Sequence, residues 1–193
     1  MTLKNLEKQL TFLKEIDRLK RVTRQSPLLD NSRRENSAEH SWHLAMYALI
    51  LDEYACELVN THRVIHMLLL HDIVEIDAGD FPIHAKSSTA VQAENEYKAA
   101  IRLFSLLPDA QRSECLALWM EFELAETEDA KFAKALNRLQ PLLTNIVTGG
   151  GTWIENDVSL DQVVSRYGPP IKRGAPLLWT ACEEWLAEHF KQG

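Results

Sequence analysis

Apolar residues recur at intervals of three or four along almost the whole chain, and this spacing constrains the fold more than any other feature. No segment shows the alternating pattern of a convincing strand. The pattern is clear near the start of the sequence, where the apolar positions are Leu6, Leu10, Leu13, Ile16 and Leu19. Such positions lie on one face of an amphipathic α-helix. The sequence therefore predicts a single all-α domain, a helical bundle.

The predicted helices are separated by residues that favour turns. Ser37 is the expected N-cap of the second helix, and Gly79 provides a left-handed cap after the third. Pro169 and Pro170 are expected to interrupt the chain before the last helix. The expected helices cover residues 3–20, 37–58, 61–76, 88–106, 109–125, 128–147, 160–166 and 176–190.

Composition and charge exclude several classes of function. The 193 residues, 46% hydrophobic and 25% charged, are ordinary for one soluble domain. A net charge of -7 without a Lys/Arg cluster disfavours binding to a nucleic acid polymer. No apolar run approaches the length of a membrane span, and Lys4, Glu7 and Lys8 argue against a signal peptide. We therefore expect a cytoplasmic protein with a small-molecule substrate and no membrane partner.

The dipeptide His71-Asp72 is the strongest indication of chemistry. It directly follows the apolar run Leu68-Leu69-Leu70, where packing alone explains a carboxylate poorly because burying an unpaired charge is costly. An imidazole and a carboxylate next to each other can instead share one divalent cation. This pattern favours a metal-dependent hydrolase.

Two further side chains are candidate ligands from other helices. His40 opens the second expected helix; taken alone, it is equally consistent with a histidine that merely starts a helix. If the second and third helices pack antiparallel, His40 and His71-Asp72 lie at the same end of the pair. A fourth ligand is expected from residues 128–147, where Asn137 is the polar position on the apolar side. The sequence thus predicts a metal site between helices.

Four blocks of sequence carry a resemblance to a known family. They are 19–24 (LKRVTR), 34–42 (RENSAEHSW), 71–80 (HDIVEIDAGD) and 131–140 (KFAKALNRLQ), and together they span most of residues 17–148. The chain resembles the HD-domain phosphohydrolases, and in particular the group that includes 5'-deoxynucleotidases acting on nucleoside monophosphates. The resemblance implies a motif core at about 17–148 and a C-terminal helical extension at about 152–193, within one domain.

The resemblance also implies the metal ligands, and the chain departs from the family pattern at one of them. His40, His71 and Asp72 match, whereas Asn137 stands where the family has an Asp. Three explanations remain open: a substitution that disables the site, a natural variant with altered metal binding, or a homologue that has lost activity. Two imidazoles and a carboxylate suit cobalt, manganese, zinc, nickel or iron better than magnesium. We expect one such divalent ion per chain.

Further residues are expected to bind substrate or move protons. Glu75 lies one helical turn after Asp72, where a carboxylate near the metal can orient or deprotonate the attacking water. The resemblance places Asp80 beside the scissile phosphate and makes Arg24 a phosphate-binding arginine. Lys86 is a further phosphate-binding candidate. The competing interpretation makes Glu75 part of a solvated acidic face, and Arg24 and Lys86 solvated surface cations.

The favoured substrate is therefore a nucleoside or deoxynucleoside 5'-monophosphate, cleaved as a phosphate monoester. One alternative is a pseudoenzyme that binds a nucleotide or a partner without turnover, as Asn137 suggests. The other is a di-iron oxygenase that uses additional histidines such as His43 and His66. The resemblance also implies a homodimer. The apolar residues of the last expected helix can contribute either to the core or to such an interface.

Overall fold

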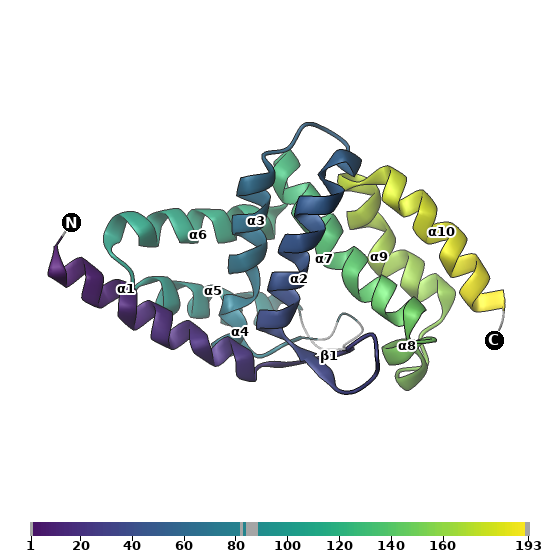
Figure 1. The fold of residues 1–193 in the computed structure, drawn as a ribbon, viewed down its shortest axis with the longest axis horizontal. Coiled ribbons are helices and arrows are strands. Elements are labelled where there is room, and N and C mark those ends of the chain that lie inside the picture. Colours follow the sequence, from purple (N-terminus) through teal and green to yellow (C-terminus); the bar gives the residue numbers. More distant parts are fainter. Residues whose placement is uncertain (1, 82, 84–88, 192–193) are drawn as a thin grey trace.

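The structure is a computed structural model that describes residues 2–81, 83 and 89–191. Helices dominate this part of the chain, so the predicted all-α class is confirmed (Figure 1). The expectation of no strands was wrong over one segment, because β1 (Thr23–Pro27) and β2 (Arg34–Asn36) pair as a small antiparallel sheet. These strands are short and polar, so they lack the alternation that identifies a strand in a sequence.

Three helices form the centre of the molecule and carry its larger core. They are α2 (Ser37–Leu51), α3 (Thr61–Leu70) and α7 (Glu128–Val147). Leu44 of α2, Met67 of α3 and Leu136 of α7 are fully buried in the same cluster. The antiparallel pairing expected for the second and third helices is therefore present, and α7 packs against both.

The N-cap of α2 is Asn36, so the prediction of Ser37 was wrong by one residue. The Asn36 side chain accepts a hydrogen bond from the Glu39 backbone N–H at 3.0 Å, and Glu39 accepts one from the Asn36 backbone N–H at 3.1 Å. This reciprocal capping box satisfies two backbone donors that the helix leaves unpaired. The Ser37 hydroxyl is thus available for another partner, Glu75.

The predicted helix over 61–76 changes geometry at the candidate metal ligands. α3 ends at Leu70, a tighter 3₁₀ turn covers His71–Val74, and the short helix α4 (Glu75–Ala78) follows. Gly79 then adopts a positive φ of 76°, as expected for a left-handed stop. Because the turn is tighter than an α-helix, side chains four residues apart do not simply stack on one face.

A second core fills the space between the N-terminal helix and a helical hairpin. α1 (Leu3–Ile16) leads into a 3₁₀ turn at Asp17–Arg21, and the hairpin consists of α5 (Thr89–Phe104) and α6 (Asp109–Leu124). Phe12, Ile73, Phe104 and Trp119 are buried together there. Ile73 and Val74 of the 3₁₀ turn that carries His71 and Asp72 are buried in this core, which therefore supports the turn.

The C-terminal part consists of α8 (Gly151–Glu155), α9 (Leu160–Gly174) and α10 (Pro176–Lys191). The predicted break at Pro169-Pro170 was wrong, because α9 continues through both prolines. Val163, Tyr167 and Ile171 keep this helix against α7, and this packing offsets the lost backbone hydrogen bonds. At Gly174 the two helices are so close that a Cβ would lie 2.2 Å from the Lys131 carbonyl oxygen.

Within the described ranges, no helix combines the length and apolar character of a membrane-spanning helix.

Candidate active site

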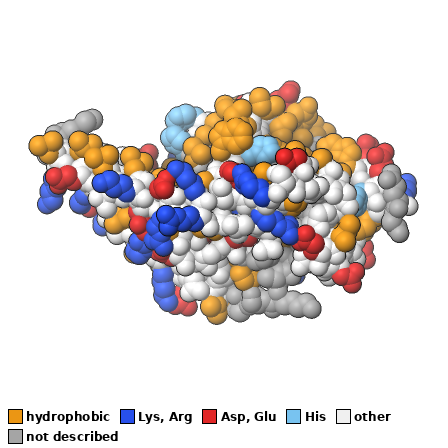
Figure 2. Space-filling model, turned by 60° about the horizontal axis from the view of Figure 1, so that its bottom comes forward, with side chains coloured by type: hydrophobic (Ala, Val, Ile, Leu, Met, Phe, Trp, Pro, Cys, Tyr) orange, Lys and Arg blue, Asp and Glu red, His pale blue; other side chains and the backbone are white. Residues whose placement is uncertain are grey.

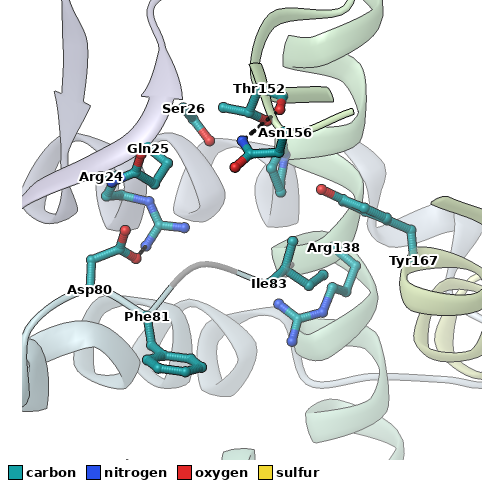
Figure 3. A pocket seen from close by; sticks show the side chains of 11 residues that line it. Arg24, Gln25, Ser26, Asp80, Phe81, Ile83, Arg138, Thr152, Asn156 and Tyr167 are labelled. Atoms are coloured by element: carbon teal, nitrogen blue, oxygen red, sulfur yellow. Dashed lines mark hydrogen bonds and ion pairs between the residues drawn. The ribbon is translucent and has the colours of Figure 1, made fainter. Parts of the chain in front are cut away.

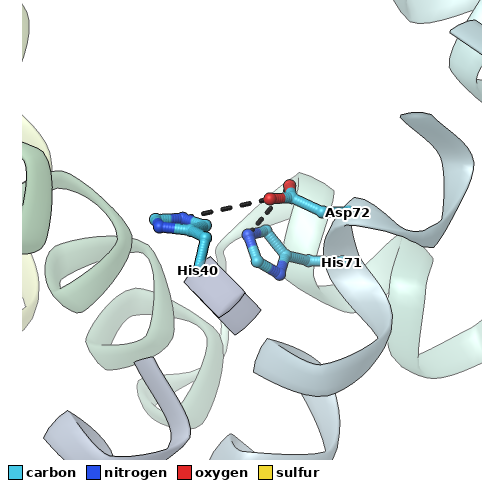
Figure 4. A group of neighbouring side chains, drawn as sticks. All are labelled: His40, His71 and Asp72. Carbon is cyan, nitrogen blue, oxygen red and sulfur yellow. Dashed lines mark ion pairs between the residues drawn. The ribbon is translucent and has the colours of Figure 1, made fainter. Parts of the chain in front are cut away.

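The three predicted metal ligands meet at the end of α2 that faces the 3₁₀ turn. His40, His71 and Asp72 are buried, and one ligand atom from each lies within 4.8 Å of the others. The Nε2 atoms of His71 and His40 are 2.9 Å and 3.9 Å from Asp72 carboxylate oxygens. Figure 4 shows the three side chains pointing toward one another.

The orientation of His71 leaves a ligand atom facing the cluster. Its Nδ1 lies 2.8 Å from the Leu68 carbonyl oxygen, and a carbonyl can only accept, so Nδ1 carries the proton. Nε2 faces the cluster, and it is buried without a hydrogen-bond partner among the described residues. Because Nε2 lies 2.9 Å from an Asp72 carboxylate oxygen, either a proton or a metal cation is needed between the two atoms. Backbone bonds of this kind commonly orient metal-binding histidines.

His40 presents the same chemistry from the other side. Its Nδ1 lies 3.5 Å from Glu35 Oε1, and its Nε2 lies 3.0 Å from the Asn137 amide oxygen Oδ1 on α7. Burial, followed by the nearby Arg24 cation, lowers the pKa of His40 and so favours the neutral ring. If the proton of the neutral ring is on Nδ1, directed toward Glu35, then Nε2 has a lone pair directed toward the Asn137 oxygen. Two acceptor atoms, His40 Nε2 and Asn137 Oδ1, then face each other, and either a shared cation or a proton on Nε2 is needed between them.

The donor set therefore fits a divalent metal. It consists of two neutral imidazole nitrogens, one carboxylate and one amide oxygen, and all four side chains are buried. Imidazole and carboxylate together are typical of transition-metal sites, whereas magnesium favours oxygen ligands and water. The amide of Asn137 contributes an oxygen but no charge, so the set carries one negative charge fewer than a family site with Asp.

Arg24, predicted to bind phosphate, lies among four carboxylates. Its guanidinium nitrogens are 2.8 Å from Asp72, 3.3 Å from Glu35, and 3.6 Å from both Glu75 and Asp80. Burial alone would lower the pKa of Arg24, but these four acids raise it above its usual value. Burial alone would likewise raise the pKa of Asp72, which His71 and Arg24 instead hold well below its usual range. Arg24 therefore serves as the shared counter-charge of the acids.

Glu75 and Asp80 lie at the same centre, beside the cluster rather than in it. Burial, together with the nearby Asp72 carboxylate, raises the pKa of Glu75 to about 9, and Ser37 donates a hydrogen bond to it. Burial also raises the pKa of Asp80, at the turn after α4. These carboxyls hold protons more tightly than ordinary acids do, a property common in groups that transfer protons.

Glu35 is a site residue that sequence analysis did not single out. It lies in β2, is 4% exposed, and contacts His40, Arg24 and the Gln140 amide, which donates at 3.3 Å. Its sequence neighbours Arg33 and Arg34 are polar, so nothing in the pattern separates this buried acid from exposed ones. In the structure it has the position of the carboxylate that orients a metal-binding histidine.

The remaining histidines considered in the sequence analysis lie away from the cluster. His43 packs edge-on against Tyr47 at 4.9 Å between ring centroids, and His66 lies 4.3 Å from His62 on the exposed side of α3. His66 is exposed, so it belongs neither to the core nor to the cluster. No described histidine beyond His40 and His71 joins the candidate metal cluster.

Two adjoining cavities open next to the cluster. One, of about 330 Å³, is lined by His71, Asp72, Glu75 and Asn137. The other, of about 350 Å³, lies between β1, α8 and α9 and is lined by polar groups including Gln25, Ser26, Thr152, Asn156 and Tyr167 (Figure 3). Phe81, Ile83 and Arg138 line both. Lys86, a predicted substrate contact, lies outside the described residues.

A buried two-histidine, one-aspartate cluster in a helical domain is the arrangement that the sequence resemblance implies. A sequence model of the HD domain family matches residues 16–179. The chain belongs to this family. A solved structure from Magnetospirillum magnetotacticum MS-1, described as a predicted metal-dependent phosphohydrolase, is 50% identical to this chain in sequence. It superposes on this structure with a TM-score of 0.92. That similarity covers 98% of this chain and 97% of the other.

Named relatives point to the same part of the family. The 5'-deoxynucleotidase HDDC2 of Danio rerio is 30% identical over 139 residues, which is 72% of this chain and 68% of that protein. A 5'-deoxynucleotidase of Erwinia tasmaniensis is 31% identical over 166 residues, 80% of this chain and 83% of that protein. The predicted relationship to HD-domain phosphohydrolases is confirmed, and the chain is a phosphohydrolase of the 5'-deoxynucleotidase-like group.

Proposed function

We propose that this protein removes phosphate from nucleoside or deoxynucleoside 5'-monophosphates. The observation that carries the proposal is the buried His40–His71–Asp72 cluster, which opens into a cavity continuous in its lining with a second, polar one. The first cavity has room for a phosphate beside the cluster, and the second offers hydroxyl and amide groups to a nucleoside. The names of the relatives support the same substrate class.

His40, His71, Asp72 and Asn137 would hold the metal ion, which we propose to be one of cobalt, manganese, zinc, nickel or iron. When bound, a divalent ion supplies Lewis-acid activation of the phosphate and of water. Glu35 positions His40, and the Leu68 carbonyl positions His71. Arg24 keeps the acids together and is proposed to contact the phosphate as well, with Lys86 as a second predicted contact.

Proton transfer is assigned to Glu75 and Asp80. Hydrolysis forms a bond from a water oxygen to phosphorus and breaks the bond between phosphorus and the 5'-oxygen. One carboxylate accepts the water's proton, and a protonated carboxyl supplies one to the departing 5'-oxygen. Glu75, which lines the cavity beside the cluster and is held by Ser37, and Asp80, which lines the polar cavity, are described carboxyls positioned for these roles.

A second candidate function is nucleotide binding without turnover, and Asn137 is the observation that favours it. The His40–Asn137 contact at 3.0 Å is a hydrogen bond when His40 Nε2 carries a proton. In that state the two side chains satisfy each other without a metal. A chain that remains in this state would bind substrate in the cavities but would not activate it.

The predicted homodimer remains a prediction, and the structure offers candidate surfaces for it. In the last helix, Leu178, Trp179 and Leu186 are buried in the core, whereas Leu177 is exposed. The outer face of α2 has more exposed apolar side chains, with Trp42, Leu49 and Ile50 each more than half exposed. Figure 2 shows hydrophobic side chains gathered beside histidines at the top of that view. We propose this face as the contact between two copies, to be tested by sedimentation of the chain and of Ile50→Glu. The predicted cytoplasmic location remains a prediction.

The deciding experiment measures phosphate release from a panel of nucleoside 5'-monophosphates with each divalent metal added in turn. His71→Gln removes a proposed ligand, and His43→Gln is the matched control because His43 lies outside the cluster. We expect turnover by the chain and by His43→Gln and none by His71→Gln. Release by Asn137→Asp alone would identify the natural chain as the binding protein. No release from any of these proteins would refute the proposed activity.

A further inference from the structure

Four cationic side chains of the described residues line the two cavities, and they differ in what surrounds them. Arg24 is held by four carboxylates. Lys134 pairs with Glu123 at 3.0 Å, and Arg166 donates a hydrogen bond to the Ile83 carbonyl at 2.7 Å. Within the described ranges, Arg138 has no hydrogen-bond acceptor and no ion pair. It is therefore the cation whose charge is least compensated by the protein.

A cavity-lining arginine without an acceptor is unfavourable unless a ligand supplies the missing acceptors or negative charge. Arg138 is half-buried in α7, and a guanidinium taken partly out of water loses hydration that only an anion or acceptors can replace. Its five N–H donors form a planar fork that matches the oxygens of a phosphate. An uncompensated arginine in a cavity wall therefore indicates a site for an anionic ligand.

Arg138 lies where an anionic substrate of the proposed reaction would bind. It directly follows Asn137, and it lines both the cavity that contains the cluster and the cavity that contains Gln25, Ser26 and Asn156. Figure 3 shows its side chain beside Ile83, with Arg24 and Asp80 on the far side of the second cavity. An anion held at this shared wall can reach the cluster from one side while the rest of its molecule occupies the polar cavity.

The charge balance around Arg24 supplies an independent reason for a second cation. One guanidinium faces the four carboxyl groups of Glu35, Asp72, Glu75 and Asp80, so its charge is shared among them before substrate enters. A phosphate monoester is a dianion near neutral pH, and it needs positive charge in addition to that of Arg24 and the proposed metal ion. Within the described ranges Arg138 forms no ion pair with these acids, and its charge remains available to the ligand.

We propose that Arg138 is a phosphate-binding residue, which anchors the phosphate of a nucleoside 5'-monophosphate at the wall shared by the two cavities. This inference rests on the proposed function and deepens it. The phosphate then faces the His40–His71–Asp72 cluster, and the nucleoside extends toward β1, α8 and α9. The C-terminal helices thereby take part in substrate selection.

The test compares Arg138→Met, Arg138→Lys and Arg112→Gln with the unaltered chain. Arg112→Gln is the control for loss of one positive charge, because Arg112 is an exposed residue of α6. With 2'-deoxyadenosine 5'-monophosphate, we expect Arg138→Met to raise KM about 10- to 100-fold, the range for losing a charge-assisted hydrogen bond. The inhibition constant for inorganic phosphate should rise in parallel. Arg138→Lys should fall between, and the control should match the unaltered chain.

A second readout separates ligand binding from a structural role. Replacing an uncompensated half-buried cation by Met should leave the thermal unfolding temperature unchanged or raise it. A structural role for Arg138 would instead lower that temperature in both variants, which would overturn the proposal. An unchanged KM together with an unchanged phosphate inhibition constant would overturn it as well.

Calorimetric titration with inorganic phosphate distinguishes this proposal from the proposed activity. Phosphate binding that weakens in Arg138→Met, in a chain that releases no phosphate from any nucleotide, supports the anion site and refutes the activity. Turnover that is the same in the chain and in all Arg138 variants supports the activity and refutes the anion site.

Discussion

Asn137→Asp should tighten metal binding strongly, and the structure sets the magnitude. Asn137 Oδ1 lies 3.0 Å from His40 Nε2, and the other ligand atoms lie within 4.8 Å of one another. A new carboxylate charge would thus be about 4 Å or less from a cation in the cluster. A unit charge pair at that distance is worth about 4 kcal/mol at an effective dielectric constant of about 20, and a divalent ion doubles this. Desolvation and repulsion from Asp72 reduce the gain to roughly half.

The remaining 3–4 kcal/mol, as an order of magnitude, corresponds to roughly 100- to 1000-fold in dissociation constant. Isothermal titration calorimetry of the chain and of Asn137→Asp with cobalt or zinc measures it directly. Asn145→Asp is the matched control, because Asn145 is buried in the same helix but bonds to Pro141 and Thr152, away from the cluster. Equal metal affinities for the chain and Asn137→Asp would refute the argument that position 137 is a ligand.

Three further outcomes follow from contacts described above. Glu75 binds its proton more tightly in the folded state, with a pKa of about 9 against 4.5 for the free group. Without metal, the free energy of unfolding should therefore fall as the pH rises from about 4.5 to 9. Urea unfolding of Glu75→Gln should show a shallower fall with pH, and an identical slope would contradict this. Glu35→Gln should weaken metal binding about 10- to 100-fold by loosening the orientation of His40, measured by the same titration, whereas Glu39→Gln should leave it unchanged. Gly174→Ala should lower the free energy of unfolding by at least about 1–3 kcal/mol, since its Cβ would collide with the Lys131 carbonyl; unchanged urea unfolding would show that α7 and α9 can separate at no cost.

The sequence predicts the helices of this fold well wherever one apolar face is buried. α6 and α7 begin at the expected residues, Asp109 and Glu128, because Pro108 and Thr127 precede them. The errors occur where long-range contacts override local preference. α9 continues through two prolines because its other face is fixed against α7, and the strands around residues 23–36 are stabilised by pairing that no local pattern records.

The same distinction applies to the candidate site. His71 and Asp72 stand out in the sequence because they interrupt an apolar run, so burial and polarity conflict visibly. Glu35 lies beside Arg34 and Asn36, and Arg138 lies on an amphipathic helix where arginines are common. Only the three-dimensional arrangement shows that one contacts His40 and that the other lines the cavity beside the cluster. The role of Arg24 as counter-charge depends on Glu35 and on three acids 48 or more residues away in the chain, which local sequence patterns do not connect.

The contact between His40 and Asn137 joins residues separated by 97 positions in the chain. During synthesis, His40, His71 and Asp72 leave the ribosome well before α7 exists to close the site. A nascent chain therefore carries three of the four proposed ligands before the helix that supplies the fourth has been made. Completion of the proposed site is thus tied to the synthesis of α7.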